Sequence, residues 1–466
     1  MNLITKIIAA ILFSILFYKQ DFGLNLILFA LMTIGILAYF NLEKFKKPNV
    51  LIMSSIFLLS TLPVFINHSV LSILSYVACF FTLVGLVAAS KASIYLNWFN
   101  GIYSVIAGYF HRKFEENATD KTEKEGEKKD IDVVHLLKLI GIPSIFIIVF
   151  VLLYKDGNPI FEELISKINF DFINFQWLLF TFLGYFLITN ISKPVPIEPT
   201  TSIDISLTNQ LSKKNNIPEE ILYKEQQLGT ILLELLNLLL VVFIITDIIS
   251  ISQSQDLASS EMSQQVHKGV NTLIASILIA IAIILYFFRG ALNFYEKNKT
   301  LKILTYTWII LNMILVLLIA IKNYDYITTY GLTYKRIGVN VYIFLTLVGL
   351  VSTFIKVMSI KNLAFLFRRN TQVAFLTLLI CSFINWDKTI TTYNIQKAEQ
   401  FIGVDYLIRL SDRNAKYLFE KIDEFQLSDA DRLRVVEKFM RYKEKSKKKN
   451  WQEIHWEAYR IKYLLK

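Results

Sequence analysis

Cysteine is scarce in this sequence, which contains only two among 466 residues. Cys79 and Cys381 both fall inside long apolar runs and lie far apart, so they form neither a disulfide framework nor a metal-binding motif of short spacing. We interpret both as small, buried apolar residues. The sequence predicts no metal site and no cofactor.

The common sequence motifs of enzymes are also missing. The chain contains no G-x-x-x-x-G-K-[ST] phosphate loop, no H-E-x-x-H zinc motif, no G-x-S-x-G nucleophile elbow and no protein-kinase motifs. These absences exclude the best-defined signatures of nucleotide, zinc and serine chemistry. No biochemical activity follows from the sequence, and a protein that is not an enzyme is the better expectation.

Proline, glycine and charged residues are few, with 8 Pro, 16 Gly and 19% charged residues, whereas 54% of the residues are hydrophobic. The mean hydropathy is +0.46. This composition is too apolar for a soluble globular protein and too rich in regular apolar runs for a disordered one. It indicates an all-α fold, a polytopic transmembrane helix bundle whose first partner is the lipid bilayer.

Long apolar runs give the expected number of spans, because a helix needs roughly 20 apolar residues to cross a bilayer. We expect about eleven: Leu3–Tyr18, Phe22–Phe40, Val50–Asn67, Val70–Ala89, Leu136–Tyr154, Trp177–Ile191, Leu228–Ile251, Val270–Phe288, Thr305–Ile321, Asn340–Ser359 and Thr371–Trp386. The first resembles a signal sequence, but no small-residue cleavage site follows it, so we expect a retained span.

Basic residues set the expected orientation, because Lys and Arg near span ends stay on the cytoplasmic side. With eleven spans and the N-terminus inside, the inner loops hold 22 Lys and Arg and the outer loops hold 7. Without the first span, every later loop would lie on the opposite side of the membrane, and the ratio of inner to outer basic residues would be inverted. A twelfth span in residues 90–114 would invert everything downstream of it, and the mixture of aromatic residues with Asn and Gly there is more typical of an interfacial helix.

The expected organisation has five segments. Residues 1–89 form a four-span segment, residues 90–135 an interfacial helix with a charged cytoplasmic loop, residues 136–227 two spans with a Pro-containing cytoplasmic loop, residues 228–386 a five-span segment, and residues 387–466 a basic helical tail. In the third segment, the prolines of KPVPIEP exclude a helix. Pro218 and the two acids after it then predict a helix start that leads into the seventh span.

The seventh span carries an acid inside the apolar run. Glu234 lies about 9 Å beyond Leu228, at 1.5 Å of rise per residue, and Asn237 follows on the same helix face. An ionised acid in mid-bilayer costs at least about 2.5 kcal/mol, so Glu234 should be protonated, paired or in contact with water. Lys356 and Arg289 belong to the same half of the membrane and permit pairing. A structural ion pair and a site that handles protons or substrate are both open interpretations.

The connector Lys322–Gly338 is the densest polar stretch on the outer side. Lys335 and Arg336 stand there against the general charge rule, and Asp325 could neutralise one of them. Tyr330 is one of several tyrosines typical of a membrane interface. Gly331 predicts a tight turn, and Thr333 predicts a cap for the following helix. The stretch is either a capped interfacial turn or an anion site; His267, at the outer end of span eight, is a polar anchor that could titrate near neutral pH.

The tail from residue 387 contains 18 Lys and Arg against 13 Asp and Glu. Ser411 and Ser428 predict helix starts, and WQEIHWEAYRIKYLL predicts a final amphipathic helix with Trp451 and Trp456. Eleven spans place this tail outside, where it could meet an envelope protein partner or lie on anionic lipid. Nucleic acid is not an expected partner, because the compartment is wrong for it.

The stretches VHKGVNTLIASI, FFRGALNFY, YGLTYKRIG and INWDKTITTYNI followed by VDYLIRLS resemble the bacterial membrane proteins grouped as domain of unknown function 4173, which is related to the group numbered 4153. The resemblance covers Leu228 to the end. It implies a multi-pass protein of the bacterial inner membrane that ends in a small helical tail, and it implies no activity.

Three hypotheses remain. The first is a non-enzymatic envelope component, accessory or sensing, whose tail and outer loops meet a partner. The second is an ion- or proton-coupled permease that uses Glu234, with Asn237 and Lys356 around it. The third is an enzyme for a lipid-linked substrate at the outer face, which requires Asp325, Lys335 and Arg336 to converge.

Overall fold

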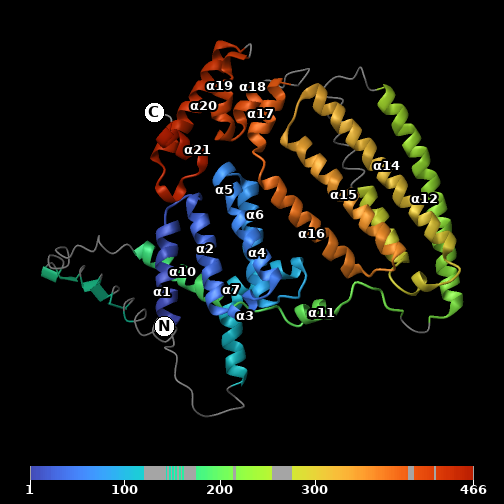
Figure 1. Ribbon diagram of the computed structural model, residues 1–466, viewed down its shortest axis with the longest axis horizontal. Helices are drawn as coiled ribbons and strands as arrows, with labels where there is room; N and C mark the ends of the chain where they lie inside the picture. Colours follow the sequence, from blue (N-terminus) through green and yellow to red (C-terminus); the bar gives the residue numbers. More distant parts are fainter. Residues whose placement is uncertain are drawn as a thin grey trace. The chain divides into compact units, whose positions relative to one another are not determined.

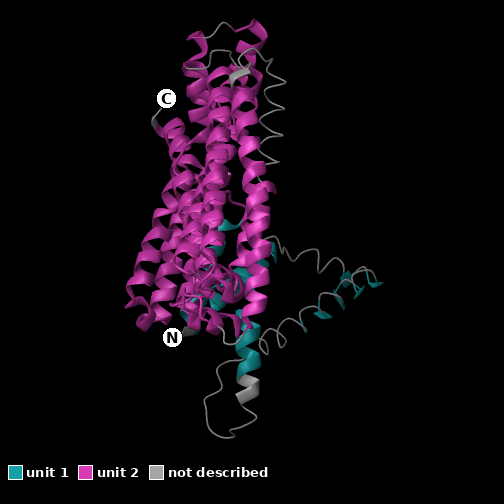
Figure 2. Cartoon of the chain, turned by 90° about the vertical axis from the view of Figure 1, so that its right-hand side faces the viewer, with its two compact units in different colours: residues 1–18, 105–190 teal, residues 19–104, 191–466 magenta. Residues whose placement is uncertain are grey.

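The computed structural model describes residues 2–119, 143, 146–147, 150–151, 153–154, 157–158, 160–161, 175–213, 217–253, 275–396, 404–424 and 427–464. The chain divides into two compact units, coloured separately in Figure 2. Unit 1 comprises residues 1–18 and 105–190, and unit 2 comprises residues 19–104 and 191–466. Each unit is described by itself below.

Helices account for the regular elements of the described residues (Figure 1). The helices before residue 210 are α1 (Asn2–Phe17), α2 (Leu24–Phe40), α3 (Leu42–Phe45), α4 (Pro48–Leu59), α5 (Thr61–Asn67), α6 (Val70–Ala88), α7 (Ile94–Thr119), α10 (Phe175–Ser192) and α11 (Thr200–Ser206). The long helices that follow are α12 (Glu219–Gln253), α14 (Lys299–Tyr330), α15 (Tyr334–Met358) and α16 (Leu363–Ser382), with the 3-10 helix η2 (Ala291–Phe294) between the first two.

Seven of the described helices are long and apolar enough to cross a membrane: Pro48–Asn67, Val70–Ala88, Phe175–Ser192, Glu219–Ile251, Lys299–Tyr330, Tyr334–Met358 and Leu363–Ser382. Three shorter apolar helices, Leu3–Phe17, Leu24–Phe40 and Ala275–Phe287, coincide with other expected spans. The expected span 136–154 lies largely outside the described residues. Helix α7, expected to be interfacial, is not one of the seven. The result is an all-helical membrane protein with seven candidate spans rather than an established set of eleven.

Unit 1 contains α1, the later part of α7 and α10. The Ser14 and Thr181 hydroxyl oxygens lie 2.7 Å apart, and the rings of Phe13 and Phe180 stack with centroids 5.3 Å apart. The Asn190 side-chain amide donates to the Val105 carbonyl over 2.8 Å. Small hydroxyl and amide groups therefore join the apolar helices through hydrogen bonds that they make with one another and with the backbone.

The first helices of unit 2 form a hairpin with one interruption. The expected span from Val50 is split at Ser60, because Pro63 has no N–H to donate to the preceding turn. His68 then adopts the left-handed conformation with φ of 46°, and Ser69 starts α6 with a capping box that includes Ser72. Close backbone approach joins α6 to α7, since a Cβ added to Gly85 would fall on the Asn97 carbonyl oxygen.

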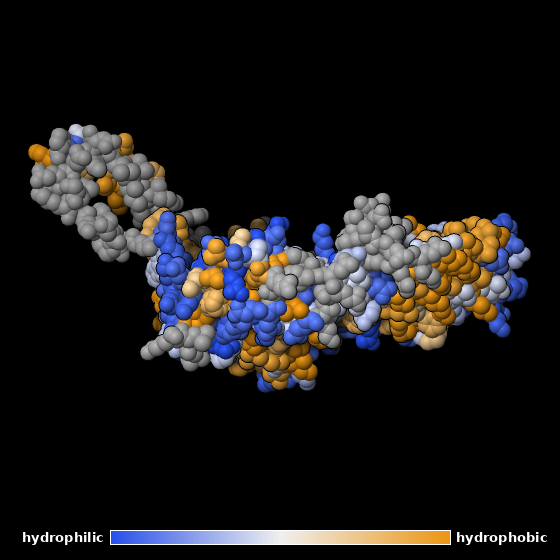
Figure 3. All heavy atoms as spheres, turned by 90° about the horizontal axis from the view of Figure 1, so that it is seen from above, coloured by the Kyte–Doolittle hydropathy of each residue, from blue (hydrophilic) through white to orange (hydrophobic). Residues whose placement is uncertain are grey.

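Helices α12, α14 and α15 pack around the apolar core of the later half of unit 2. Its largest fully buried side chains include Leu233, Ile284, Phe288, Leu301 and Ile309. The predicted start of α12 is confirmed, because the helix begins directly after Pro218 with two acids in its first turn. The opposite face of α12 carries exposed leucines and valines, and Figure 3 shows an extensive apolar surface at this end of unit 2.

The segment 193–213 crosses the end of unit 2 where α6 ends and α16 begins, which we call the loop end. Its first residues are not helical, as the prolines predict. The Asp204 carboxylate is 4% exposed and accepts hydrogen bonds from the Ser93 N–H, the Tyr95 hydroxyl and the Arg368 guanidinium. Gln210 pairs with Lys361 in an isolated bridge. These contacts tie the α6–α7 connection to the α15–α16 connection.

The C-terminal helices gather at the other end of unit 2, above the α5–α6 and α14–α15 turns (Figure 1). They are α17 (Trp386–Gln396), α18 (Val404–Arg409), η3 (Asp412–Asn414), α19 (Ala415–Glu420), η4 (Ile422–Glu424), α20 (Asp429–Lys448), η5 (Trp451–Glu453), α21 (Trp456–Tyr459) and η6 (Arg460–Leu464). Both predicted starts are confirmed, since Ser411 and Ser428 each accept a backbone N–H two or three residues on. The expected continuous final helix is wrong, because Ile454 and His455 are extended.

Candidate functional site where the C-terminal helices meet the span ends

The C-terminal helices contact the turns at the ends of the spans through polar side chains, and we call this contact the docking seam. A buried carboxylate lies at its centre. Asp387 lies in the first turn of α17 and is fully buried. Its Oδ1 accepts from the Tyr334 hydroxyl over 2.7 Å, and its Oδ2 accepts from the Arg413 Nε over 2.7 Å and from the Ser411 hydroxyl. Because both oxygens are engaged in charge-assisted bonds, the buried carboxylate is paired and satisfied.

Arg413 extends the seam to a turn from the N-terminal helices. Its Nη1 donates to the His68 carbonyl over 3.1 Å, while its Nη2 reaches Asp387 Oδ2 at 2.7 Å. The left-handed backbone at His68 turns this carbonyl toward the C-terminal helices. One guanidinium, carried by η3, therefore joins the α5–α6 turn to the first turn of α17.

The second part of the seam is a pair of histidines. The rings of His68 and His455 stack with centroids 4.8 Å apart and planes 15° apart. The pKa of His68 is lowered to about 4 and that of His455 to about 3, mainly by burial and in smaller part by the positive charge of Lys449. Arg413 also lowers the pKa of His68, whereas Asp21 raises it. Both rings are therefore neutral at pH 7.

Backbone bonds hold the tail beside these rings. The Leu24 N–H donates to the Ile454 carbonyl over 3.0 Å, and the Asp21 N–H donates to the Glu453 carboxylate over 3.2 Å. A Cβ on Gly23 would fall on the Glu453 backbone, so only glycine permits this approach. The interruption of the final helix has its physical reason here, because the extended Ile454 uses its carbonyl across the seam instead of within a helix.

The connector 322–338 contributes the third part of the seam. Gly331 has φ of 79° and Thr333 accepts the Arg336 N–H, which confirms the predicted turn and cap. The Arg336 guanidinium turns inward: it donates to the Tyr330 carbonyl over 2.8 Å and to the Gly331 carbonyl, and lies 3.7 Å from the centroid of the Tyr326 ring. These contacts explain why Arg336 occurs on the expected outer side, where this chain otherwise has few basic residues.

The tail contacts this turn through an amide. The Asn394 side chain accepts the Leu332 N–H and donates to the Leu332 carbonyl over 2.9 Å. The Tyr406 hydroxyl accepts the Tyr334 N–H over 3.1 Å. Three separate turns of the spans are therefore bonded to the same group of C-terminal helices.

A buried lysine organises the C-terminal helices internally. Lys438 is 3% exposed, and its ammonium donates to the Ile408 and Leu410 carbonyls and to Asn414 Oδ1 over 2.8–2.9 Å. Burial lowers the pKa of Lys438 to about 8. The ammonium thus satisfies carbonyls at the end of α18 that would otherwise lack partners.

The connector residues that a lipid-linked substrate site would need do not converge. Asp325 and Lys335 are exposed, whereas Arg336 is 7% exposed and held by backbone carbonyls. Tyr330 is buried in the core beneath the turn. His267, the remaining outer candidate, lies outside the described residues.

The intramembrane candidates are also separated. Glu234 is exposed on α12, while Asn237 is buried and donates to the Leu304 carbonyl over 3.0 Å. Lys356 is 2% exposed and donates to the Phe288 carbonyl over 2.8 Å, and Arg289 pairs with Glu225 at 3.1 Å. Within the described part of the chain, the permitted pairing of Glu234 with either cation is not made.

Sequence reasoning did not identify Asp387, Arg413, His68 or His455 as site residues. Two signals were present: Asp387 directly follows the last expected span, and Ser411 and Arg413 stand at a predicted helix start. Neither signal shows that these residues meet, because the meeting depends on the return of the tail to the span ends.

Comparison with known families assigns the chain to a family. Residues 53–420 match the family described as domain of unknown function DUF4153, so the chain belongs to that family. The match reaches well into the first half of the chain and is to the related family, whereas the resemblance to group 4173 is not shown. No curated protein and no solved structure matches the chain. The family and the seven apolar helices together define a membrane protein of unknown activity.

Proposed function

We propose that the protein is a non-enzymatic component of the bacterial inner membrane whose C-terminal helices face the envelope and act as a sensing module for a protein partner. The observation that carries the proposal is the docking seam. Polar side chains there bond one another and the backbone: Asp387 has both oxygens engaged, and Arg413 and Asn394 bond to turns of the spans. Such groups are arranged to hold two parts together rather than to contact a substrate.

The histidine pair supports a sensing role. The stacked rings are neutral when docked, and the His68 Nδ1 has no hydrogen-bond partner among the described residues. Protonation would place two positive charges together beside Lys449 and Arg413, while the negative charge of Asp21 would favour protonation of His68. Acid in the envelope would therefore favour release of the tail from the span ends. The released surface would then be open to the partner.

The experiment measures docking directly in the full chain. Spin labels at Val70→Cys and Leu433→Cys, both exposed positions, report the distance between the α5–α6 turn and α20 in lipid nanodiscs. Cys79 and Cys381 are replaced by Ala so that only the two introduced thiols react. We expect a narrow distance distribution at pH 7.5 and a longer, broader one at pH 5.0. An unchanged distribution at pH 5.0 would contradict the sensing role.

A specific observation favours a coupled permease as second candidate. Glu234 is exposed on an apolar face of α12 and has no ion pair among the described residues, so its charge must be neutralised, hydrated or covered in the membrane. If the permease interpretation is right, Glu234→Gln abolishes ion-dependent uptake into proteoliposomes. Thr246→Val, a polar-to-apolar change on the same helix, should leave uptake intact. Equal uptake by Glu234→Gln and the unaltered chain rules out this role.

A further inference from the structure

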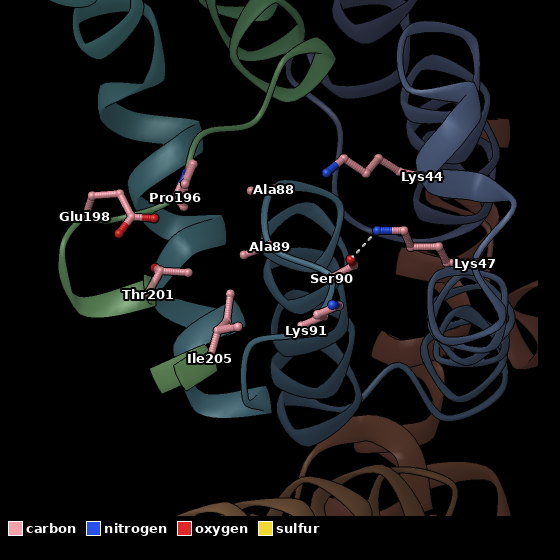
Figure 4. A pocket seen from close by; sticks show the side chains of 10 residues that line it. All are labelled: Lys44, Lys47, Ala88, Ala89, Ser90, Lys91, Pro196, Glu198, Thr201 and Ile205. Carbon is pink, nitrogen blue, oxygen red and sulfur yellow. Dashed lines mark hydrogen bonds between the residues drawn. The ribbon is translucent and has the colours of Figure 1, made fainter. Parts of the chain in front are cut away.

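A pocket of about 220 Å³ opens at the loop end of unit 2, opposite the docking seam. Figure 4 shows Lys44 and Lys47 on one wall, Glu198 and Thr201 on the other, and Ser90 and Lys91 between them. The walls come from the α2–α4 connection, from the end of α6 and the α6–α7 connection, and from α11 with the segment before it. The pocket thus lies beside the start of α4 and the end of α6, two ends of candidate membrane spans.

The pocket carries an excess of positive charge. Lys44 and Lys91 make no ion pair among the described residues, and the Lys47 ammonium donates to the Ser90 hydroxyl over 2.8 Å. The opposing Glu198 is already engaged, because its Oε2 accepts the Ser202 hydroxyl over 2.6 Å and the Ser202 N–H over 3.1 Å. Three ammonium groups therefore surround a small space that contains one occupied carboxylate.

Two further features point to the kind of ligand. The Ser90 carbonyl, which would repel an anion, is occupied by the Asn49 amide. Apolar side chains of Pro196 and Ile205 complete the far wall. A cavity with several lysines and an apolar border suits a phosphate group at the boundary between lipid and water.

We propose that this pocket binds a phosphate group, carried either by the headgroup of an anionic phospholipid or by free phosphate. The lysines act as flexible point charges around the phosphate oxygens, and the apolar wall accommodates the glycerol end of a lipid. Lys44 and Lys91 provide charge, and Lys47 is positioned by Ser90. The inference is independent of the function proposed for the docking seam, because the two sites lie at opposite ends of unit 2.

The test uses the full chain, purified in neutral detergent and stripped of lipid. Binding of dioleoyl phosphatidylglycerol, dioleoyl phosphatidylcholine and inorganic phosphate is measured by native mass spectrometry and by titration calorimetry. Since each lysine near an anionic headgroup contributes about 1 kcal/mol, Lys44→Ala, Lys47→Ala and Lys91→Ala combined should weaken phosphatidylglycerol binding roughly a hundredfold. The triple replacement by Arg should retain binding.

Lys46→Ala is the matched control, because Lys46 lies in the same connection but pairs with Glu43 at 2.6 Å, outside the pocket. Preference for phosphatidylglycerol over phosphatidylcholine that disappears in the triple Ala variant supports a lipid ligand. Binding of inorganic phosphate with the same dependence on the three lysines supports free phosphate. The proposal is overturned if the triple Ala variant binds phosphatidylglycerol as tightly as the unaltered chain does and also binds phosphate as tightly. It is overturned as well if neither probe binds the unaltered chain.

Discussion

The imidazole rings of His68 and His455 lie face to face, 4.8 Å apart, although one belongs to a turn between the first helices of unit 2 and the other to its last helices. Burial makes it costly to charge either ring of this pair, and two imidazolium ions would in addition repel each other. The docking seam therefore depends on the protonation state of these two residues.

The first prediction concerns pH. The pKa of each histidine is lowered from 6.5 to about 4 or about 3 in the docked state, so the undocked state binds more protons below pH 6.5. Docking is fully stable above pH 6.5 and weakens as the pH falls toward 4. At about 1.4 kcal/mol per pH unit and per histidine, it loses on the order of 4 kcal/mol between pH 6.5 and 5.0.

Thermal unfolding of the detergent-solubilised chain at these two pH values measures the effect. The double variant His68→Phe and His455→Phe keeps two stacked rings and removes both titrating groups. Its transition temperature should vary much less with pH over this interval. An equal pH dependence in the variant and the unaltered chain would assign the effect to other groups.

The second prediction concerns the buried carboxylate. Asp387→Asn leaves the Arg413 guanidinium partly buried without its counter-charge, so we expect a loss of about 3–5 kcal/mol from the stability of the docked tail. Asp405→Asn is the matched control, because Asp405 makes an equally direct pair with Arg434 but on the surface. The control should lose less than about 1 kcal/mol. Chemical denaturation followed by tryptophan fluorescence compares the two, and equal losses would refute a special role for Asp387.

The third prediction tests the contact between α6 and α7. Gly85→Ala places a methyl group on the Asn97 carbonyl, and the two helices must separate. Overpacking of this kind costs about 1–3 kcal/mol or more. Gly35→Ala in α2 meets no atom within 4 Å and should be neutral or stabilise by up to about 1 kcal/mol. The yield of folded monomer and its melting temperature should separate the two variants, and similar values would argue against close packing at Gly85.

The fourth prediction concerns the α14–α15 turn. Gly331 has φ of 79° and ψ of −177°, a region open almost only to glycine, so Gly331→Ala should destabilise the protein by about 1–3 kcal/mol. Gly338→Ala, in helical backbone with open space around it, should be tolerated. Because Leu332 also binds Asn394, the Gly331 variant should expose its tail to limited proteolysis sooner. If the variant and the unaltered chain are cleaved at the same rate, the conformation of the turn does not affect docking of the tail.

The sequence could predict those features that depend on residues close together in the chain. Long apolar runs predict spans because the backbone of a bilayer-crossing segment must satisfy itself, and Pro218, Gly331, Thr333, Ser411 and Ser428 act within a few residues of where they stand. The predictions for these five residues are confirmed by a helix end or a cap, whereas only seven of the eleven predicted spans coincide with a described helix long and apolar enough to cross a membrane.

The rotation of helices and the return of the tail could not be predicted in the same way. Glu234 and Asn237 share a helix face in the sequence pattern, yet α12 turns Leu233, Asn237 and Leu240 toward its neighbours and leaves Glu234 exposed. Charge alone suggests Asp325 as a partner for Arg336, whereas in the structure Arg336 binds backbone carbonyls that only the folded turn presents. Such pairings depend on contacts between distant segments, which a single sequence does not record.

The hydrogen bond from Leu24 to Ile454 has a consequence for biogenesis. During translation, residues near 24 reach the membrane long before residues near 454 are synthesised. The turns that contain Gly23 and His68 therefore remain uncovered until the C-terminal residues have been made. Completion of the docking seam is therefore a late event in synthesis. A chain that stops before residue 450 would keep this surface exposed, and membrane quality-control proteases would have a means to distinguish it from the finished protein.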